Sequence, residues 1–255
     1  MNRKISKSFA LALLSLLPIQ AMAATPTFSL SGHELKGDSH MEFTVTQFYP
    51  APVSLETVVG ALSDLNLKKS FSTVIVKIGK TPVNGDDSEY LISSTGSTKL
   101  LGFTITKSIG ATCSETRTDS SWTQTCDAAV NYKDTSLLLK RSHTVVACNQ
   151  NNEGVKCTST STVTPNNVKF FGIGRTAEQL CFSSTSESIR SMGHVFEYIL
   201  HGQNVDAANQ AYLQDHLDQW NSTFDTLWSL SDQSSLKGNV KLNGSLTSGL
   251  KYTLE

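Results

Sequence analysis

Five cysteines are the residues whose spacing most clearly specifies chemistry in this 255-residue chain. The segments 113–126 and 148–157 each begin and end with a cysteine and carry polar residues at their midpoint. If either segment folds into a hairpin with a two-residue turn, its terminal cysteines lie opposite each other at a non-hydrogen-bonded position, where paired side chains are closest. We therefore predict two disulfide bonds, Cys113–Cys126 and Cys148–Cys157.

The alternatives for these four thiols are free buried cysteines or a metal site. No Cys-x-x-Cys and no Cys–His spacing typical of zinc occurs, so we predict no metal ion. The fifth cysteine, Cys181, stands in the apolar run Gln179-Leu180-Cys181-Phe182, which is typical of a strand. The sequence favours a buried structural thiol there, with a nucleophile or an intermolecular disulfide as the alternatives.

Motifs of known catalytic machinery are missing from the sequence. There is no Gly-x-Ser-x-Gly elbow, no His-Glu-x-x-His helix and no phosphate-binding glycine loop. Among the six histidines, His194 and His201 are seven residues apart near one helical face and could flank a site, but the sequence disfavours a functional role for the pair. The sequence favours a non-enzymatic protein without a cofactor; a secreted hydrolase that uses a histidine and an acid is the alternative.

The first 23 residues have the order of a secretory signal peptide. A basic stretch is followed by an apolar run over 9–17 and by the small-x-small sequence Ala21-Met22-Ala23. The apolar run is far shorter than the roughly 20 residues needed to span a bilayer. We predict that 1–23 is cleaved, that the protein is bacterial and periplasmic or secreted, and that it has no transmembrane anchor.

The composition beyond this segment is rich in hydroxyl groups and poor in charge. The chain has 34 serines and 28 threonines, and only 17% of its residues are charged. Positions 24–255 carry 18 basic against 22 acidic residues, a net charge of −4. This balance argues against a polybasic nucleic-acid binder and against a cationic membrane peptide. Serine and threonine are common on the solvent face of an antiparallel sheet.

The elements that would position these residues begin after a lead-in segment, 24–40. Alternating apolar residues predict a strand over 41–49, and Ser54 is the expected N-cap of a helix that ends near Asn66. Short polar turns then separate a series of strand candidates, which predicts a curved antiparallel meander. These candidates are 71–78, 89–94, 100–109, 112–118, 122–132, 136–148, 155–163, 168–173 and 176–183.

Two helices and a hairpin are expected at the C-terminal end. The capping-box sequence 184–187 predicts a helix to about 201, and Asp206 is a possible cap for a second helix over 206–231. The apolar face of this second helix favours docking on the domain's own sheet; a dimer seam and a membrane-surface helix are the alternatives, the last disfavoured by a polar face without lysine or arginine. Asn243-Gly244 predicts the turn of a terminal hairpin.

This order of strand, helix, antiparallel meander and amphipathic helix resembles the START-like helix-grip superfamily, which includes polyketide cyclase-like proteins. The most similar stretch is 43–71, in which a strand leads through Pro50-Ala51-Pro52-Val53 into a helix that ends in Leu62-Ser63-Asp64. The resemblance implies an α+β fold in which a curved antiparallel sheet wraps an amphipathic helix. It covers 41–201, and 202–255 is then an added C-terminal helix and hairpin.

The same resemblance implies a cavity between the sheet and the helix 185–201. Met192 and Phe196 would line its helix side, and Phe103 and Ile105 are possible contributors from the sheet. A mostly apolar cavity suits a lipid-like or polycyclic ligand. The alternative is that these residues fill a solid core. A third kind of function, a membrane-acting or interaction protein built from the hydroxyl-rich hairpins, is disfavoured because the disulfides would restrain refolding.

Overall fold

The computed structural model describes residues 24–35, 40–72, 75–83, 85–100, 103–166, 176–215, 240–245 and 249–254. The strands are β1 (Thr27–Leu35), β2 (His40–Pro50), β3 (Ile75–Val83), β4 (Asp86–Leu100), β5 (Phe103–Arg117), β6 (Ser121–Ala128), β7 (Leu139–Asn151), β8 (Gly154–Pro165), β9 (Val240–Ser245) and β10 (Gly249–Leu254). The helices are α1 (Leu55–Ser63), α2 (Leu65–Ser70), α3 (Thr135–Leu138), α4 (Thr176–Leu200) and α5 (Val205–Asp215). The predicted signal 1–23 lies outside the described residues.

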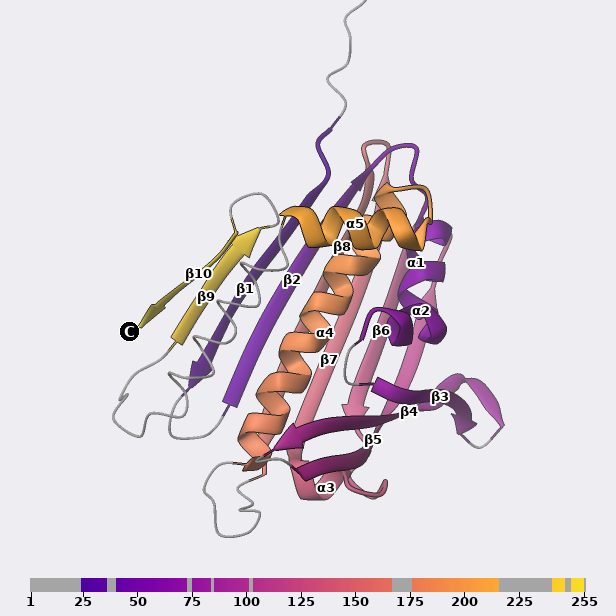
Figure 1. The fold of residues 1–255 in the computed structure, drawn as a ribbon. Helices are drawn as coiled ribbons and strands as arrows, with labels where there is room; N and C mark the ends of the chain where they lie inside the picture. The colour runs from indigo at the N-terminus through magenta and orange to yellow at the C-terminus, as the bar shows by residue number, and fades with distance from the viewer. Residues whose placement is uncertain are drawn as a thin grey trace, which may run out of the picture.

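The strands form one antiparallel sheet in the order β10-β9-β1-β2-β8-β7-β6-β5-β4-β3. From β3 to β8 each strand pairs with the next along the chain, and β2 then pairs with β8. Figure 1 shows β3 running at a steep angle to β2 and β7, so the sheet is strongly twisted. The predicted antiparallel meander and the α+β fold class are confirmed.

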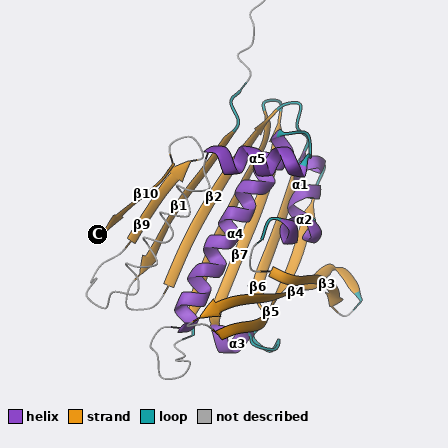
Figure 2. Cartoon of the chain, viewed as in Figure 1, coloured by secondary structure: helices purple, strands orange, loops and turns teal. Residues whose placement is uncertain are grey.

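The sheet has one buried face, which we call the inner face. On β2 every second side chain is buried, from Met41 through Phe43, Val45 and Gln47 to Tyr49, and the residues between are more exposed. Helices α1, α2, α4 and α5 all lie on one side of the sheet, and α4 runs along it (Figures 1 and 2). The core is therefore a single layer between the inner face and these helices.

The first helical segment follows the local sequence closely. The Ser54 hydroxyl accepts a hydrogen bond from the backbone N–H of Thr57 at 3.2 Å, which makes Ser54 the predicted N-cap of α1. Asp64 interrupts the segment, since it ends α1 and its carboxylate caps α2 by accepting from the backbone N–H groups of Asn66 and Leu67. Phe71 then ends α2, so β3 begins at Ile75 rather than at Phe71 as the sequence predicted.

The long helix begins earlier than the sequence predicts. We expected a strand over 176–183 and a helix only from the capping box at 184–187, but α4 is a continuous helix of 25 residues. The strand prediction is wrong because a short apolar run such as Leu180-Cys181-Phe182 has no periodicity of its own that separates a strand from a helix. Cys181 therefore lies on a helix, and the expected strand 168–173 lies outside the described residues.

Segments at both ends of the chain also join the sheet. The predicted lead-in contains β1, which pairs with β2 on one side and with β9 on the other. The terminal hairpin β9–β10 is confirmed, but Asn243 and Gly244 lie within β9 rather than at its turn. The cap of α5 is Asn204, whose side chain accepts from the Ala207 N–H at 3.0 Å, rather than Asp206. Most of the expected helix 206–231 lies outside the described residues.

Both disulfide bonds are present. Cys113 and Cys126 face each other on β5 and β6, and Cys148 and Cys157 do so on β7 and β8, each pair with its Cα atoms 4.0 Å apart. The two connecting turns are Asp119-Ser120 and Asn152-Glu153. Cys148 and Cys157 are buried in the core, so this bridge is also a packing element.

Candidate functional site

A polar contact within an apolar core joins helix α4 to the inner face. The Gln47 side-chain amide N–H donates to the backbone carbonyl of Met192 at 3.0 Å. The Tyr49 hydroxyl donates to the side-chain oxygen Oε1 of Gln47 at 3.1 Å. Phe196 packs beside this pair, with its ring centroid 5.6 Å from that of Phe28 and 5.1 Å from that of Tyr49. Burial and the charge of Glu197 raise the pKa of Tyr49, so its hydroxyl stays protonated.

Some apolar side chains of the inner face and of α4 are only partly buried. Ile109 on β5, Leu139 and Val146 on β7, and Met192 on α4 pack against the core but stay partly exposed. On α4, the partly buried Met192, Tyr198 and Leu200 alternate with buried residues: Ile189, Val195, Phe196 and Ile199.

The four residues predicted to line a ligand cavity fall into different settings. Met192 is partly buried against the core, and Phe196 is fully buried against Phe28 and Tyr49. Phe103 and Ile105 lie on β5, but their side chains are outside the described part of the structure. A ligand contact for these residues stays a prediction.

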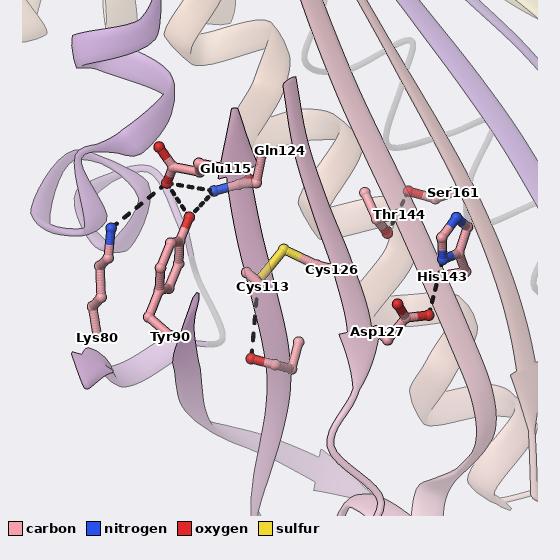
Figure 3. Close-up of a disulfide and its surroundings, with 11 residues drawn as sticks. Lys80, Tyr90, Cys113, Glu115, Gln124, Cys126, Asp127, His143, Thr144 and Ser161 are labelled. Carbon is pink, nitrogen blue, oxygen red and sulfur yellow. Dashed lines mark hydrogen bonds and ion pairs between the residues drawn. A yellow bond between two sulfur atoms is a disulfide. The ribbon is translucent and has the colours of Figure 1, made fainter. Parts of the chain in front are cut away.

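A second feature of the inner face is a polar cluster that we call the Glu115 cluster: Lys80, Tyr90, Glu115, Trp122 and Gln124. Figure 3 shows Lys80, Tyr90, Glu115 and Gln124. The Glu115 carboxylate accepts from the Tyr90 hydroxyl, from the Trp122 indole N–H at 3.1 Å and from the Gln124 amide at 3.4 Å. The Gln124 amide also donates to the Tyr90 hydroxyl. The cluster joins four neighbouring strands, β3 to β6.

Two lysines, Lys80 and Lys68, interact electrostatically with the Glu115 carboxylate. Lys80 Nζ lies 3.6 Å from Glu115 Oε1 and 3.5 Å from the centroid of the Tyr90 ring. Burial alone would raise the pKa of Glu115, but the hydrogen bonds from Tyr90 and Trp122, the charge of Lys80 and the Gln124 bond together hold that pKa below its ordinary value. Burial lowers the pKa of Lys68 on α2, and the charges of Glu115 and Asp64 oppose that effect.

Sequence reasoning missed the Glu115 cluster. Tyr90 is 25 residues from Glu115 and 34 residues from Gln124 along the chain. The pairing register of β4, β5 and β6 brings the three side chains together. One signal was available: Glu115 is two residues from Cys113 and Gln124 two residues from Cys126. The predicted disulfide alone therefore places Glu115 opposite Gln124 on the face that the cysteines occupy.

The histidines do not form a comparable site in the described part of the chain. His143 Nδ1 lies 2.9 Å from the Asp127 carboxylate, but both side chains are exposed, and alternation along β6 and β7 places them on the face opposite the helices. His194 stacks on Phe71, and His201 pairs with Glu197 within one helical turn, so the two do not flank a common site. No group of three potential metal ligands occurs among the described residues.

Comparisons with known proteins found similarity at the level of structure. No protein-family model matches this chain, and no curated protein matches its sequence. Human STARD10 superimposes with a TM-score of 0.49 at 9% identity, over 83% of this chain and 80% of that one. A STAR-related lipid transfer protein from Xanthomonas axonopodis gives a TM-score of 0.44 at 14% identity, over 64% of this chain and 91% of that one.

An aromatase/cyclase, Zhui, from Streptomyces sp. R1128 gives a TM-score of 0.45 at 11% identity, over 66% of this chain and 96% of that one. At such scores these likenesses carry no argument about ligand or activity. The described topology itself, with β2, α1, α2, the meander β3–β8 and α4 along one face, is that of the helix-grip fold. Among the described residues no helix is long and apolar enough to cross a membrane.

Proposed function

We propose that this is an exported, non-enzymatic protein that binds an apolar or lipid-like small molecule between the inner face of its sheet and helix α4. The observation that supports it most directly is that apolar side chains of β5, β7 and α4 pack against the core but are only partly buried: Ile109, Leu139, Val146 and Met192. Ligand sites are lined mostly by apolar side chains.

The location of polar groups in this region also favours a ligand that is mostly apolar. The hydroxyls of Thr144 and Ser161 lie on the same inner face and are hydrogen-bonded to each other at 2.9 Å, with one of them as the donor. The side-chain amide of Gln47 is hydrogen-bonded to the Met192 carbonyl and to the Tyr49 hydroxyl. A ligand that buries hydrocarbon there need not compete for these groups, and a single hydroxyl or carbonyl could reach Thr144 and Ser161.

Native mass spectrometry of protein purified without detergent or organic solvent tests the proposal. We expect a mass excess from one bound molecule per chain, which disappears after solvent extraction and is identified in the extract. Protein with the mass of the bare chain, before and after incubation with a panel of fatty acids, sterols and polycyclic aromatics, would contradict the proposal.

A further inference from the structure

We propose that Tyr90 and Glu115 form a preformed binding site for an ammonium group, which the chain's own Lys80 occupies until a ligand carrying a primary amine replaces it. This site does not rest on the proposed function, because it is formed by the Glu115 cluster rather than by the apolar residues between the inner face and α4. Lys80 itself demonstrates that the site accepts an ammonium ion.

The contacts of Lys80 are those of a bound cation. Its Nζ lies 3.5 Å from the centroid of the Tyr90 ring, within the range in which the face of an aromatic ring attracts a cation. The same atom lies 3.6 Å from a Glu115 carboxylate oxygen. An aromatic face and a carboxylate on one cation are the two groups that recognise organic ammonium ions.

Tyr90 and Glu115, which bind the Lys80 ammonium, are held in place by contacts that do not involve Lys80. Tyr90 is 1% exposed, and its hydroxyl is bonded both to Glu115 and to the Gln124 amide. The second carboxylate oxygen of Glu115 is held by the buried indole of Trp122. Because these groups orient one another, removing the lysine ammonium leaves the ring and the carboxylate in place.

Lys80 is, in contrast, held weakly. It lies on β3, the edge strand of the sheet, and its side chain is 45% exposed. A solvent-accessible ion pair of this length contributes little to stability, since screening and side-chain entropy offset most of the attraction. An ammonium group from solution can therefore compete with Lys80 at small cost to the fold.

The local charge balance favours a cation as the replacement. The Glu115 carboxylate is held in its ionised form, and Lys80 is paired with it. When the Lys80 side chain moves into solvent, this negative charge remains beside the Tyr90 ring without the Lys80 ammonium. An alkyl ammonium restores the balance, whereas an uncharged or anionic group does not.

The test uses butylammonium chloride, which reproduces the Lys80 side chain, and butanol, its uncharged counterpart. Calorimetric titration compares the wild-type protein with Lys80→Ala and with Lys77→Ala, which removes an exposed lysine from the same strand. We expect saturable butylammonium binding to all three proteins, about 2- to 30-fold tighter in Lys80→Ala, the range set by one cation–π contact freed from competition. Butanol should not bind saturably to any of them.

A second readout is the thermal unfolding midpoint, which butylammonium should raise more in Lys80→Ala than in Lys77→Ala, by refilling the vacated contact. Equal affinity of Lys80→Ala and Lys77→Ala for butylammonium would overturn the proposal, as would equal binding of butanol. No saturable binding to the wild-type protein at the highest soluble concentration would show that Lys80 is not displaceable, and would overturn it as well.

Discussion

Glu115 is a carboxylate on the inner face with several polar partners. Its carboxylate receives hydrogen bonds from a tyrosine, an indole and an amide, and it pairs with Lys80. These groups hold the ionised form strongly enough to outweigh its burial, so its pKa lies below the ordinary value. A carboxylate in this state cannot serve as a general acid near neutral pH, which fits a binding or structural role.

Glu115→Gln should lower the free energy of unfolding at pH 7 by about 1–3 kcal/mol, because an amide N–H then faces donors that need an acceptor. The difference between wild type and variant should shrink as pH falls. A depressed folded-state pKa gives stability that is fully present above the unfolded-state value, about 4.3, and is lost as pH falls through the lower folded-state value. Urea unfolding of both proteins across this range measures it; a difference independent of pH would contradict the assignment.

The backbone conformation of Gly154 and the atoms around it leave no room for a side chain. Its φ is +147°, and an added Cβ would lie 2.0 Å from the carbonyl oxygen of Tyr49. Gly154→Ala should therefore destabilise the protein by at least about 2 kcal/mol.

The matched control is Gly60→Ala, in helix α1, where nothing lies within 4 Å of the added Cβ. This change should instead stabilise by up to about 1 kcal/mol through helix propensity. Thermal unfolding of both variants checks the pair, and a Gly154→Ala protein as stable as wild type would contradict the described β2–β8 register.

At the scale of elements, each disulfide links the two strands of one hairpin on the inner face, β5–β6 or β7–β8. In the chain-entropy description each closes a short loop and contributes about 3 kcal/mol. Replacing both cysteines of one bridge by alanine should cost about that amount for Cys113–Cys126. The cost should be greater for Cys148–Cys157, because both of its cysteines are buried in the core, whereas Cys126 of the other bridge is only partly buried.

Guanidinium unfolding of the two double-alanine variants and of the wild-type protein measures these costs. The Cys113–Cys126 variant is the internal control for loop closure, since its loop is the longer of the two. A smaller loss on removing Cys148–Cys157 than on removing Cys113–Cys126 would show that core packing of the second bridge contributes nothing.

Several elements could be predicted from the sequence because their signals are local. The two hairpins follow from cysteine spacing, α1 from the Ser54 cap, and the buried face of β2 from the alternation of Met41 to Tyr49. The start of α4 could not, because Leu180-Cys181-Phe182 is equally compatible with a strand and a helix. The contacts of Lys80 and Tyr90 with Glu115 could not either, since they depend on pairing between strands that no local pattern specifies.

At the scale of the whole molecule, a ten-stranded sheet presents two different faces. Helices α1, α2, α4 and α5 lie on the inner face (Figure 2). On β8, Thr158, Thr160 and Thr162 alternate with Cys157, Ser159, Ser161 and Val163 and lie on the opposite face. The richness in threonine is thus explained in part by a sheet face that no helix in the described ranges covers.

The proposed ligand site lies between the inner face of the sheet and helix α4. Neighbouring valines on β7 provide a matched test: Val146 lies on the inner face, opposite Gln124 and Ser159, and Val145 lies on the other face. Phenylalanine at position 146 would occupy the space that a ligand needs, and phenylalanine at position 145 would not.

The most direct measurement is a fluorescence titration with N-phenyl-1-naphthylamine, an uncharged apolar dye, on wild type, Val146→Phe and Val145→Phe. We predict saturable binding of one dye per wild-type chain, a Kd at least about tenfold higher for Val146→Phe, and an unchanged Kd for Val145→Phe. Circular dichroism confirms that the three proteins are equally folded. No saturable binding to wild type, or equal Kd values for Val146→Phe and Val145→Phe, would contradict the claim.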